Sequence, residues 1–431
     1  MFNTQYMQAS VAAMIIATLT ACSSGGGDTA LGGSTDVTSS GAITAFGSVV
    51  VNGVRYETEN ARIVSEDDGS VIIDNPTDDQ LKQVLGLGQV ITVRGSRSDD
   101  SNGVADTIRV DDELVGEVES VNETDGSFKV LSQTVSVTPD TIIDDSIIEA
   151  ARGVEVPNDQ RFGDLPETLD QLLAEGMIVE ANGFPSQNGL EATRIEDVSN
   201  QTAPGGGALD DEVKGFVSQL NPGISFMINN LTVLYDNSDL DSEDFANRSL
   251  AEGDFVEAHG DAIAGTTSMD AFRIELEDDV LDDDFDSGDI EVEGMIKKVT
   301  QDDIGTGGVI VINGIDIRVD DVSLFSEGLR VEVKGILLSD GSILIVRLED
   351  ESEDTIRTED QVVSADATSF TTRLGLTVTP TDRSRLEDDT LEDDDNLSIS
   401  QFLVNVDGQR VEARGFPLGS DTVWTRLEIE D

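Results

Sequence analysis

The chain has 431 residues, of which 88 are Asp or Glu and 26 are Lys or Arg, so its formal charge at pH 7 is −62. Electrostatic capture of a phosphate backbone needs clustered cations, and no stretch of this sequence supplies them, so nucleic acid is excluded as a partner. The single cysteine excludes an intrachain disulfide and a four-thiolate metal site.

Residues 1–21 have the pattern of a secretory signal peptide. The apolar run from Val11 to Ala21 is too short to span ~30 Å of hydrocarbon but has the length of a signal-peptide core. It leads into Leu-Thr-Ala-Cys, ending at Cys22, which resembles the lipobox of bacterial lipoproteins. We therefore expect lipidation of Cys22 and a membrane partner through that anchor. The implied location is the bacterial cell envelope, on the outer membrane, facing the periplasm or the cell surface. The alternative is an incidental cysteine.

The next segment, residues 22–40, contains mainly Gly, Ser, Thr and Asp and offers almost nothing to bury. Such a composition is typical of a flexible chain. We expect it to act as a tether between the lipid and the first folded unit.

After the tether the sequence repeats one pattern five times, and each copy opens with a short strand. Gly precedes this strand in the first four copies, at Gly41, Gly116, Gly215 and Gly294, and Gln361 replaces it in the fifth. A hairpin follows in several copies, most clearly at Asn52-Gly53 and Asn313-Gly314. Asn-Gly suits the positive φ angles of a tight turn between twisted strands.

Some copies then carry a helical stretch. Pro166 to Glu175 places Leu169, Leu172 and Leu173 on one face, with Pro near its start and Gly176 past its end, which predicts a short helix. Asp79 to Leu85 is a weaker version of the same pattern.

Each copy continues with a segment of spacing Gly-x6-Gly. The residues between the glycines alternate, with Val256 and Ala258 on one side and Glu257 on the other in the third copy, which predicts a half-buried strand bounded by glycines. The five pairs are Gly88 and Gly95, Gly176 and Gly183, Gly253 and Gly260, Gly328 and Gly335, and Gly408 and Gly415.

The last strand of each copy contains an Arg, an aliphatic residue and an acid. We expect the aliphatic residue to point inward and the Arg to form surface ion pairs with neighbouring acids, a structural rather than a functional role. The triplets are Arg109-Val110-Asp111, Arg194-Ile195-Glu196, Arg273-Ile274-Glu275, Arg347-Leu348-Glu349 and Arg426-Leu427-Glu428.

Three strands, a helix or loop and then two strands is the order of an OB-like barrel. The low aromatic content, 4%, is compatible with the modest core of such a barrel. We therefore predict a mainly all-β chain of five tandem small OB-like β-barrels, some with a short helix before the fourth strand. We name them unit 1 (41–114), unit 2 (115–201), unit 3 (211–284), unit 4 (288–354) and unit 5 (355–431).

The opening of unit 1 resembles the repeat known as domain of unknown function 5666. The similar residues are Gly41-Ala42-Ile43-Thr44-Ala45-Phe46-Gly47-Ser48 and Val51-Asn52-Gly53-Val54-Arg55-Tyr56. Unit 2 is similar over Val130 to Val135, with Ser132 where the family usually has Gly, and units 3 to 5 match more loosely. The resemblance implies a tandem β-barrel lipoprotein of bacterial envelopes, and it brings no catalytic residues.

Between units 3 and 4 the chain is rich in Asp and imitates a calcium loop. Asp282, Asp284, Asp286 and Glu293 have the spacing of positions 1, 3, 5 and 12. Ser287 stands where that loop needs Gly, and no flanking helices are evident, so a solvated acidic linker is the alternative. Calcium is the one cofactor for which the sequence offers candidate ligands.

His259 is the only histidine of the chain. The other units have Arg94, Asn182, Lys334 and Arg414 at its position, and we expect a position that accepts all of these to face solvent. A catalytic base needs an orienting partner and a nucleophile, and no nucleophile elbow, phosphate-binding loop or paired-His motif is present in the sequence.

These observations favour a non-enzymatic cell-envelope lipoprotein whose barrels bind a protein or glycan, or act as a spacer, at the cell surface. Repetition of one unit suits multivalent contact, whereas catalysis gathers unlike residues in one pocket. Two alternatives stay open. One is a polysaccharide-active hydrolase with paired carboxylates, and the other is a calcium-dependent adhesion module.

Overall fold

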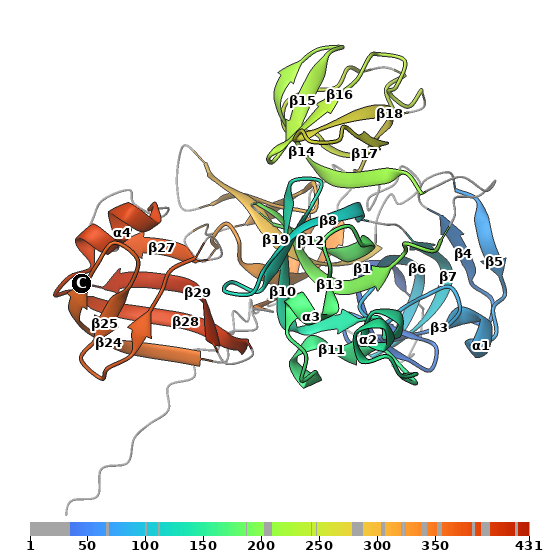
Figure 1. The fold of residues 1–431 in the computed structure, drawn as a ribbon. Helices are drawn as coiled ribbons and strands as arrows, with labels where there is room; N and C mark the ends of the chain where they lie inside the picture. Colours follow the sequence, from blue (N-terminus) through green and yellow to red (C-terminus); the bar gives the residue numbers. More distant parts are fainter. Residues whose placement is uncertain are drawn as a thin grey trace, which may run out of the picture. The chain divides into compact units, whose positions relative to one another are not determined.

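The computed structural model shows a chain built mainly of β-strands (Figure 1). None of the helices in the described part of the chain is both long enough and apolar enough to cross a membrane. The structure describes residues 35–65, 69–99, 101–110, 113–186, 188–201, 209–242, 244–246, 248–277, 288–302, 307–319, 322, 325–337, 343–350, 356–381, 384–388, 397–418 and 421–430.

Unit 1 is a closed barrel. Its first strand pairs antiparallel with the second and the fourth, the third runs parallel to the fifth, and the fourth and fifth are antiparallel. Two short strands and a helix lie between the third and fourth barrel strands. The barrel strands are β1 (Thr35–Phe46), β2 (Val49–Val51), β3 (Val54–Glu57), β6 (Val90–Asp99) and β7 (Asn102–Val110), and the inserted elements are β4 (Arg62–Ser65), β5 (Val71–Asp74) and α1 (Asp78–Leu81).

Unit 2 closes in the same way, with the same order of parallel and antiparallel pairs. Its third and fourth strands are joined by a longer connection that contains two α-helices. The strands are β8 (Leu114–Asn122), β9 (Ser127–Val130), β10 (Gln133–Ile143), β12 (Ile178–Pro185) and β13 (Gly189–Asp197), and the connection holds α2 (Asp145–Arg152), β11 (Gln160–Arg161), η1 (Phe162–Asp164) and α3 (Leu169–Leu172).

Unit 3 is the simplest closed barrel, with five strands and no helix between the third and the fourth among its described residues. The strands are β14 (Asp211–Asn221), β15 (Ser225–Ile228), β16 (Leu231–Leu234), β17 (Phe255–Ala262) and β18 (Ser268–Leu276).

Units 4 and 5 keep the order but vary the third strand. In unit 4 the third strand lies in contact with the fifth. In unit 5 it is split in two, and the second part runs parallel to the fifth strand. Unit 4 contains β19 (Gly288–Gln301), β20 (Gly308–Ile312), β21 (Ile315–Val319), β22 (Arg330–Leu337) and β23 (Ile343–Asp350), and unit 5 contains β24 (Ile356–Ala365), β25 (Phe370–Thr372), β26 (Thr377–Val378), β27 (Arg385–Asp388), α4 (Ile399–Asn405), β28 (Arg410–Leu418) and β29 (Asp421–Glu430).

This connectivity is that of the OB fold, so the predicted fold class is confirmed. The alternating pattern of the fourth strand also holds, because Val256 and Ala258 are fully buried in the core of unit 3. The tight Asn-Gly turns hold as well: Asn52 and Gly53 have φ angles of 49° and 72°.

Glycine is required at the two ends of the Gly-x6-Gly segment for different structural reasons. The first has a positive φ in every unit, between 79° at Gly88 and 88° at Gly253, which an L side chain rarely adopts. The second lies at a β-bulge, where the register between the fourth and fifth strands shifts in all five units. At Gly260 a Cβ would overlap the backbone carbonyl oxygen of Asp270 on the facing strand.

Three local expectations need correction. The strand β1 begins at Thr35, within the expected tether, because Val37 is buried and the backbone pairs with β6. The helix α3 has four residues rather than the expected stretch from Pro166 to Glu175, although all three predicted leucines are buried. The helices α2 and α4 were not expected, since their apolar positions are few and their flanks are rich in acids.

Candidate functional site

The residues singled out as sites from sequence lie mostly outside the described residues. This holds for Cys22 and for Asp282, Asp284 and Asp286 of the acidic loop, so lipidation and calcium binding stay predictions. Glu293 is described, on β19. Its carboxylate accepts hydrogen bonds from Arg330 Nε at 3.0 Å and Nη2 at 2.8 Å.

The structure instead brings together charged side chains on the outer side of three adjacent strands, most completely in units 3 and 5. The first, fourth and fifth strands pair in such a register that two side chains from each strand form two rows of three. We call these six side chains the charge grid. In unit 5 one row is Arg357, Arg414 and Arg426 and the other is Glu359, Glu412 and Glu428.

The grid of unit 5 is a balanced set of ion pairs. Glu412 at its centre is 3% exposed. Its Oε2 accepts from Arg357 at 2.5 Å, and its Oε1 accepts from Arg414. Burial alone would raise the pKa of Glu412, but the two guanidinium groups lower it below its usual value. The central carboxylate is therefore held as an anion with a cation on each oxygen.

The grid of unit 3 has the same geometry but different chemistry. One row is Glu212, His259 and Arg273, and the other is Lys214, Glu257 and Glu275. His259 is 4% exposed, so the expectation that it faces solvent is wrong. The outer side of these strands is not solvent-facing, because the long side chains of the neighbouring strands cover the central one.

His259 is surrounded by charged groups. Its Nε2 lies 3.3 Å from Glu257 Oε2, 3.4 Å from Glu275 Oε2 and 2.8 Å from Arg273 Nη2, and its Nδ1 lies 3.6 Å from Glu212 Oε2. Burial alone would lower the pKa of His259, but hydrogen bonds with Glu257 and Glu275 raise the pKa to about 9.

Unit 4 has a lysine at the fourth-strand position that His259 occupies in unit 3 and Arg414 in unit 5. Lys334 Nζ lies 2.8 Å from Glu332 Oε1 and 3.2 Å from Glu291 Oε1. This fourth-strand position, two residues after the buried Glu, therefore carries Lys334 in unit 4, Arg414 in unit 5 and His259 in unit 3. In these three units the grid places a cationic or basic group beside a buried acid.

Unit 2 places its cation on the fifth strand instead. Arg194 is buried and lies 2.7 Å from Asp144, 2.6 Å from Asp159 and 3.1 Å from Glu196. Asp144, Asp145 and Asp159 are close enough together to hold a metal ion, but the Arg194 guanidinium already lies among them. The expected ion pairs of this Arg are present, but they are buried rather than at the surface.

Unit 1 departs from the pattern. Its grid positions include Thr38, Ser40 and Thr92, and Arg109 faces Thr92 rather than Arg94. The Arg-aliphatic-acid triplet of unit 1 is therefore displaced by two residues relative to the other four units, which the similar spacing in the sequence did not reveal.

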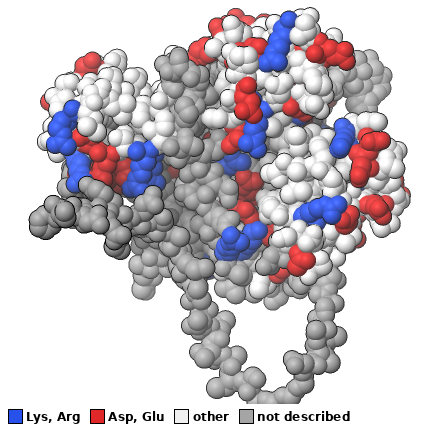
Figure 2. All heavy atoms as spheres, turned by 90° about the horizontal axis from the view of Figure 1, so that it is seen from below, with Lys and Arg blue, Asp and Glu red and all other residues white. Residues whose placement is uncertain are grey.

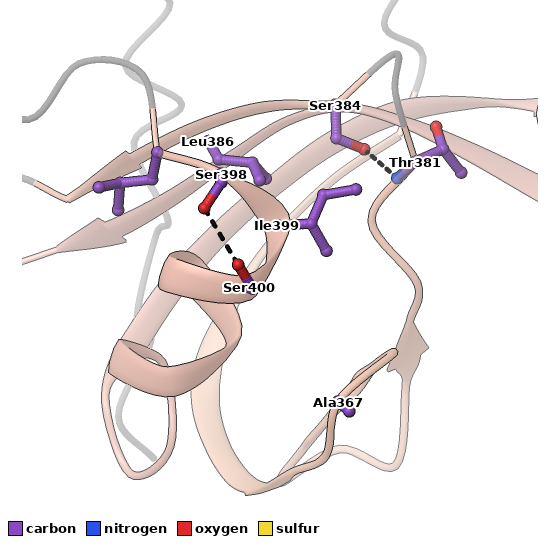
Figure 3. Close-up of a pocket in the computed structure, with 8 residues that line it drawn as sticks. Ala367, Thr381, Ser384, Leu386, Ser398, Ile399 and Ser400 are labelled. Carbon is purple, nitrogen blue, oxygen red and sulfur yellow. Dashed lines mark hydrogen bonds between the residues drawn. The ribbon is translucent and has the colours of Figure 1, made fainter.

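An open pocket of about 550 Å³ lies in unit 5 beside the start of α4 (Figure 3). Ser398 Oγ lies 3.2 Å from Ser400 Oγ, and the Thr381 backbone N–H donates to Ser384 Oγ at 2.9 Å. None of the described residues that line it is titratable, so it offers no acid or base. Its lining is Ala367, Thr381, Ser384, Leu386, Leu397, Ser398, Ile399 and Ser400.

The described surface mixes charges of both signs. Figure 2 shows Lys and Arg side chains lying beside Asp and Glu side chains on one face, rather than one uninterrupted acidic surface. Part of the negative charge of the acidic side chains is therefore compensated locally by neighbouring basic residues.

Comparison with known proteins gives a family match without an activity. Residues 115–196 and 214–275 each match the model of a domain of unknown function, DUF5666. These segments are the barrels of units 2 and 3, while unit 1, whose opening first suggested this family, lies outside both. The two matches are consistent with repeats of that family.

Curated proteins give no match. Among solved structures, "drosophila Unr CSD456" is similar, with 15% sequence identity and a TM-score of 0.13, over 56% of this chain and 97% of that one.

Sequence reasoning missed the charge grid, although part of its signal was present. Glu stands at the fourth position between the two glycines in units 2 to 5, at Glu180, Glu257, Glu332 and Glu412. In units 3 to 5 this acid stands two residues before a basic residue or a His, and an Arg lies on the next strand, which indicates cross-strand pairing. The burial of the acid depends on which residues face each other across three strands.

Proposed function

We propose that the chain is a lipid-anchored protein of the bacterial cell envelope whose β-barrels bind a glycan or protein partner multivalently at the cell surface. The observation that carries this proposal is the recurrence of one barrel along a chain whose start resembles a lipoprotein signal. Linked modules raise the effective concentration of each after the first has bound, so weak contacts of single barrels add up to stable attachment.

The character of the barrels supports binding rather than turnover. Their interiors are filled by Val, Ile, Leu and Phe side chains, such as Val118, Phe128 and Val135 in unit 2 and Phe226 and Ile228 in unit 3. The charge grids of units 4 and 5 use buried acids in ion pairs with cations. A general acid for glycoside hydrolysis must instead be poised near a substrate cleft with its proton.

The anchor is tested by expressing the chain in a bacterium with radiolabelled palmitate, beside a Cys22→Ser variant. We expect label and membrane retention for the native chain and neither for the variant. A native chain without label that is recovered in the soluble periplasmic fraction would contradict the anchored part of the proposal.

The multivalent part is tested by binding to a glycan array and to purified cell-wall fractions. The native order of units is compared with a chain ending at residue 354, which lacks unit 5. We expect the same ligands but at least about tenfold weaker apparent affinity for the shorter chain, since one contact is lost from a linked set. Release of soluble sugars during incubation would instead favour the hydrolase. Unchanged affinity would point to a single binding unit.

A further inference from the structure

Glu257 of unit 3 and Glu412 of unit 5 occupy the same grid position but have different neighbours. Glu412 accepts from Arg357 on one oxygen and from Arg414 on the other. At the positions of these two arginines unit 3 has Glu212 and His259. Two guanidinium groups are thus replaced by a carboxylate and an imidazole, which are side chains that bind metal ions.

The replacement leaves a buried carboxylate incompletely satisfied. Glu257 is 1% exposed, and its Oε1 has no hydrogen-bond partner. One donor atom each from Glu212, Glu257 and His259 lie within 4.8 Å of one another, and all three residues are buried. Two carboxylates that face each other in a buried site repel unless a proton or a cation lies between them.

The charges of the surrounding side chains show how much positive charge is lacking. Four acids lie together, namely Glu212, Glu257, Glu275 and Glu277, against the two fixed cations Lys214 and Arg273. The set therefore has two more negative than positive charges. An imidazolium supplies one positive charge, whereas a divalent ion beside a neutral imidazole supplies both.

We propose that Glu212, Glu257 and His259 bind a divalent transition-metal ion, for which Zn²⁺ is the probe. Ligands at roughly 2.0 to 2.1 Å from a tetrahedral zinc ion lie roughly 3.3 Å from one another. The distance from His259 Nε2 to Glu257 Oε2 is 3.3 Å. An imidazole ligand selects zinc-like ions over calcium, which takes oxygen ligands.

Arg273 is the group that must move when the ion binds. Its Nη2 lies 2.8 Å from His259 Nε2, but its side chain is 31% exposed and also contacts Glu275 at 3.2 Å. It can therefore turn toward Glu275 and solvent without leaving a buried charge unpaired. Lys214 is held by Glu277 at 2.8 Å and stays in place.

The experiment uses the soluble chain from residue 23 to 431, purified without a histidine tag. Because His259 is the only histidine, ¹⁵N-histidine labelling reports this ring alone. At pH 7 we expect one equivalent of Zn²⁺ to change the ring nitrogen signals to those of a neutral ring with one metal-bound nitrogen. Ring signals that do not change at one equivalent overturn the proposal.

Calorimetry with matched variants separates this site from the many surface carboxylates. With 10 mM Ca²⁺ present to occupy those, we expect Glu257→Gln to weaken Zn²⁺ binding by more than about tenfold. Glu412→Gln, the same change at the same grid position of unit 5, leaves the affinity unchanged. Equal affinity in both variants overturns the proposal.

A third variant guards against loss of folding. His259→Arg restores the cation found in unit 5, so we expect it to fold, as judged by circular dichroism and thermal melting, and to lose the specific Zn²⁺ site. A folded His259→Arg chain that binds Zn²⁺ as well as the native chain would show that the ion lies elsewhere.

Discussion

Units 3 and 5 share a barrel, a Gly-x6-Gly strand and a buried glutamate at the centre of the charge grid, yet they compensate that glutamate differently. In unit 5 two guanidinium groups donate to Glu412, whereas in unit 3 Glu257 faces Lys214 on the neighbouring strand and lies beside His259. The barrel thus fixes where positive charge is needed, while the side chains decide what supplies it. In unit 5 all of this positive charge is permanent, whereas in unit 3 only that of Lys214 is, and the rest depends on a proton or an ion.

Units 3 and 5 share the β-bulge at the second glycine of the Gly-x6-Gly segment. Substitutions that disrupt this bulge have the largest expected effect on stability. Gly260→Ala and Gly415→Ala each place a Cβ against a carbonyl oxygen of the facing strand. We expect each to destabilise its own unit by about 3 kcal/mol, since backbone must shift on both strands. Hydrogen exchange measured by mass spectrometry resolves the effect unit by unit.

Gly253→Asn, two residues before the strand that contains Gly260, is the control in unit 3. Gly253 has a φ of 88° but open space around a Cβ, so the cost is conformational only, about 1 kcal/mol. Equal protection loss in Gly253→Asn and Gly260→Ala would contradict the role of the bulge.

The permanent cations of unit 5 give the second prediction. Arg414→Ala removes the partner of Glu412 Oε1 and leaves Arg357 alone beside a buried carboxylate. We expect a loss of about 2 kcal/mol, below the full cost of an unpaired buried charge because one arginine remains. Urea unfolding followed by the single tryptophan, Trp424 of unit 5, measures it. Arg410→Ala, an exposed arginine of the same strand, should change stability by less than about 1 kcal/mol.

Unit 5 also has a predicted pH dependence with a definite sign. The pKa of Glu412 is lowered from its usual value of 4.5 because Arg357 and Arg414 outweigh the effect of burial. A carboxyl with a depressed folded pKa stabilises the fold above the unfolded value and loses this contribution as pH falls through the folded pKa. The Trp424 signal should therefore report falling stability below about pH 4.5.

Glu412→Gln is the matched control for this dependence. The neutral amide cannot titrate, so the variant should be less stable at pH 7 but should lose less stability between pH 5 and pH 3. An identical pH profile for the variant and the native chain would assign the acid sensitivity to other carboxyl groups of unit 5.

The parts of the molecule that were predictable from sequence are those with a local cause. A positive φ favours Gly, an alternating strand has period two, and both are visible at Gly253 to Gly260 without knowledge of the fold. The grid was not predictable, because its burial also depends on pairing with the first strand of the unit, which is far from the fourth and fifth strands in sequence. His259 was expected in solvent for that reason and is buried.

The opening glycine also shows why sequence alone was insufficient. Whether Gln361 or the residue before it aligns with the opening Gly of the other units can be decided only from the pairing register of the strands. Gly215 of unit 3 faces Val256, and the residue of unit 5 that faces the equivalent Val411 is Asp360 rather than Gln361. Asp360 therefore stands where the other units have their opening Gly, which corrects the assignment made from the sequence. A Cβ at Gly215 would collide with Ile228, so the acid is tolerated only in unit 5.

Asp360 gives the smallest predicted effect. Its Oδ2 accepts from the Leu374 backbone N–H at 2.7 Å, and its Oδ1 lies 3.1 Å from Arg373. Asp360→Ala leaves that N–H to find water at an exposed turn, so we expect a loss of about 1 kcal/mol in the Trp424 transition. Gly215→Asp, the reverse exchange in unit 3, should cost more because Ile228 must move. If Gly215→Asp proved neutral by hydrogen exchange, a close approach of the first two strands in unit 3 would not be the reason why that unit has Gly where unit 5 has Asp360.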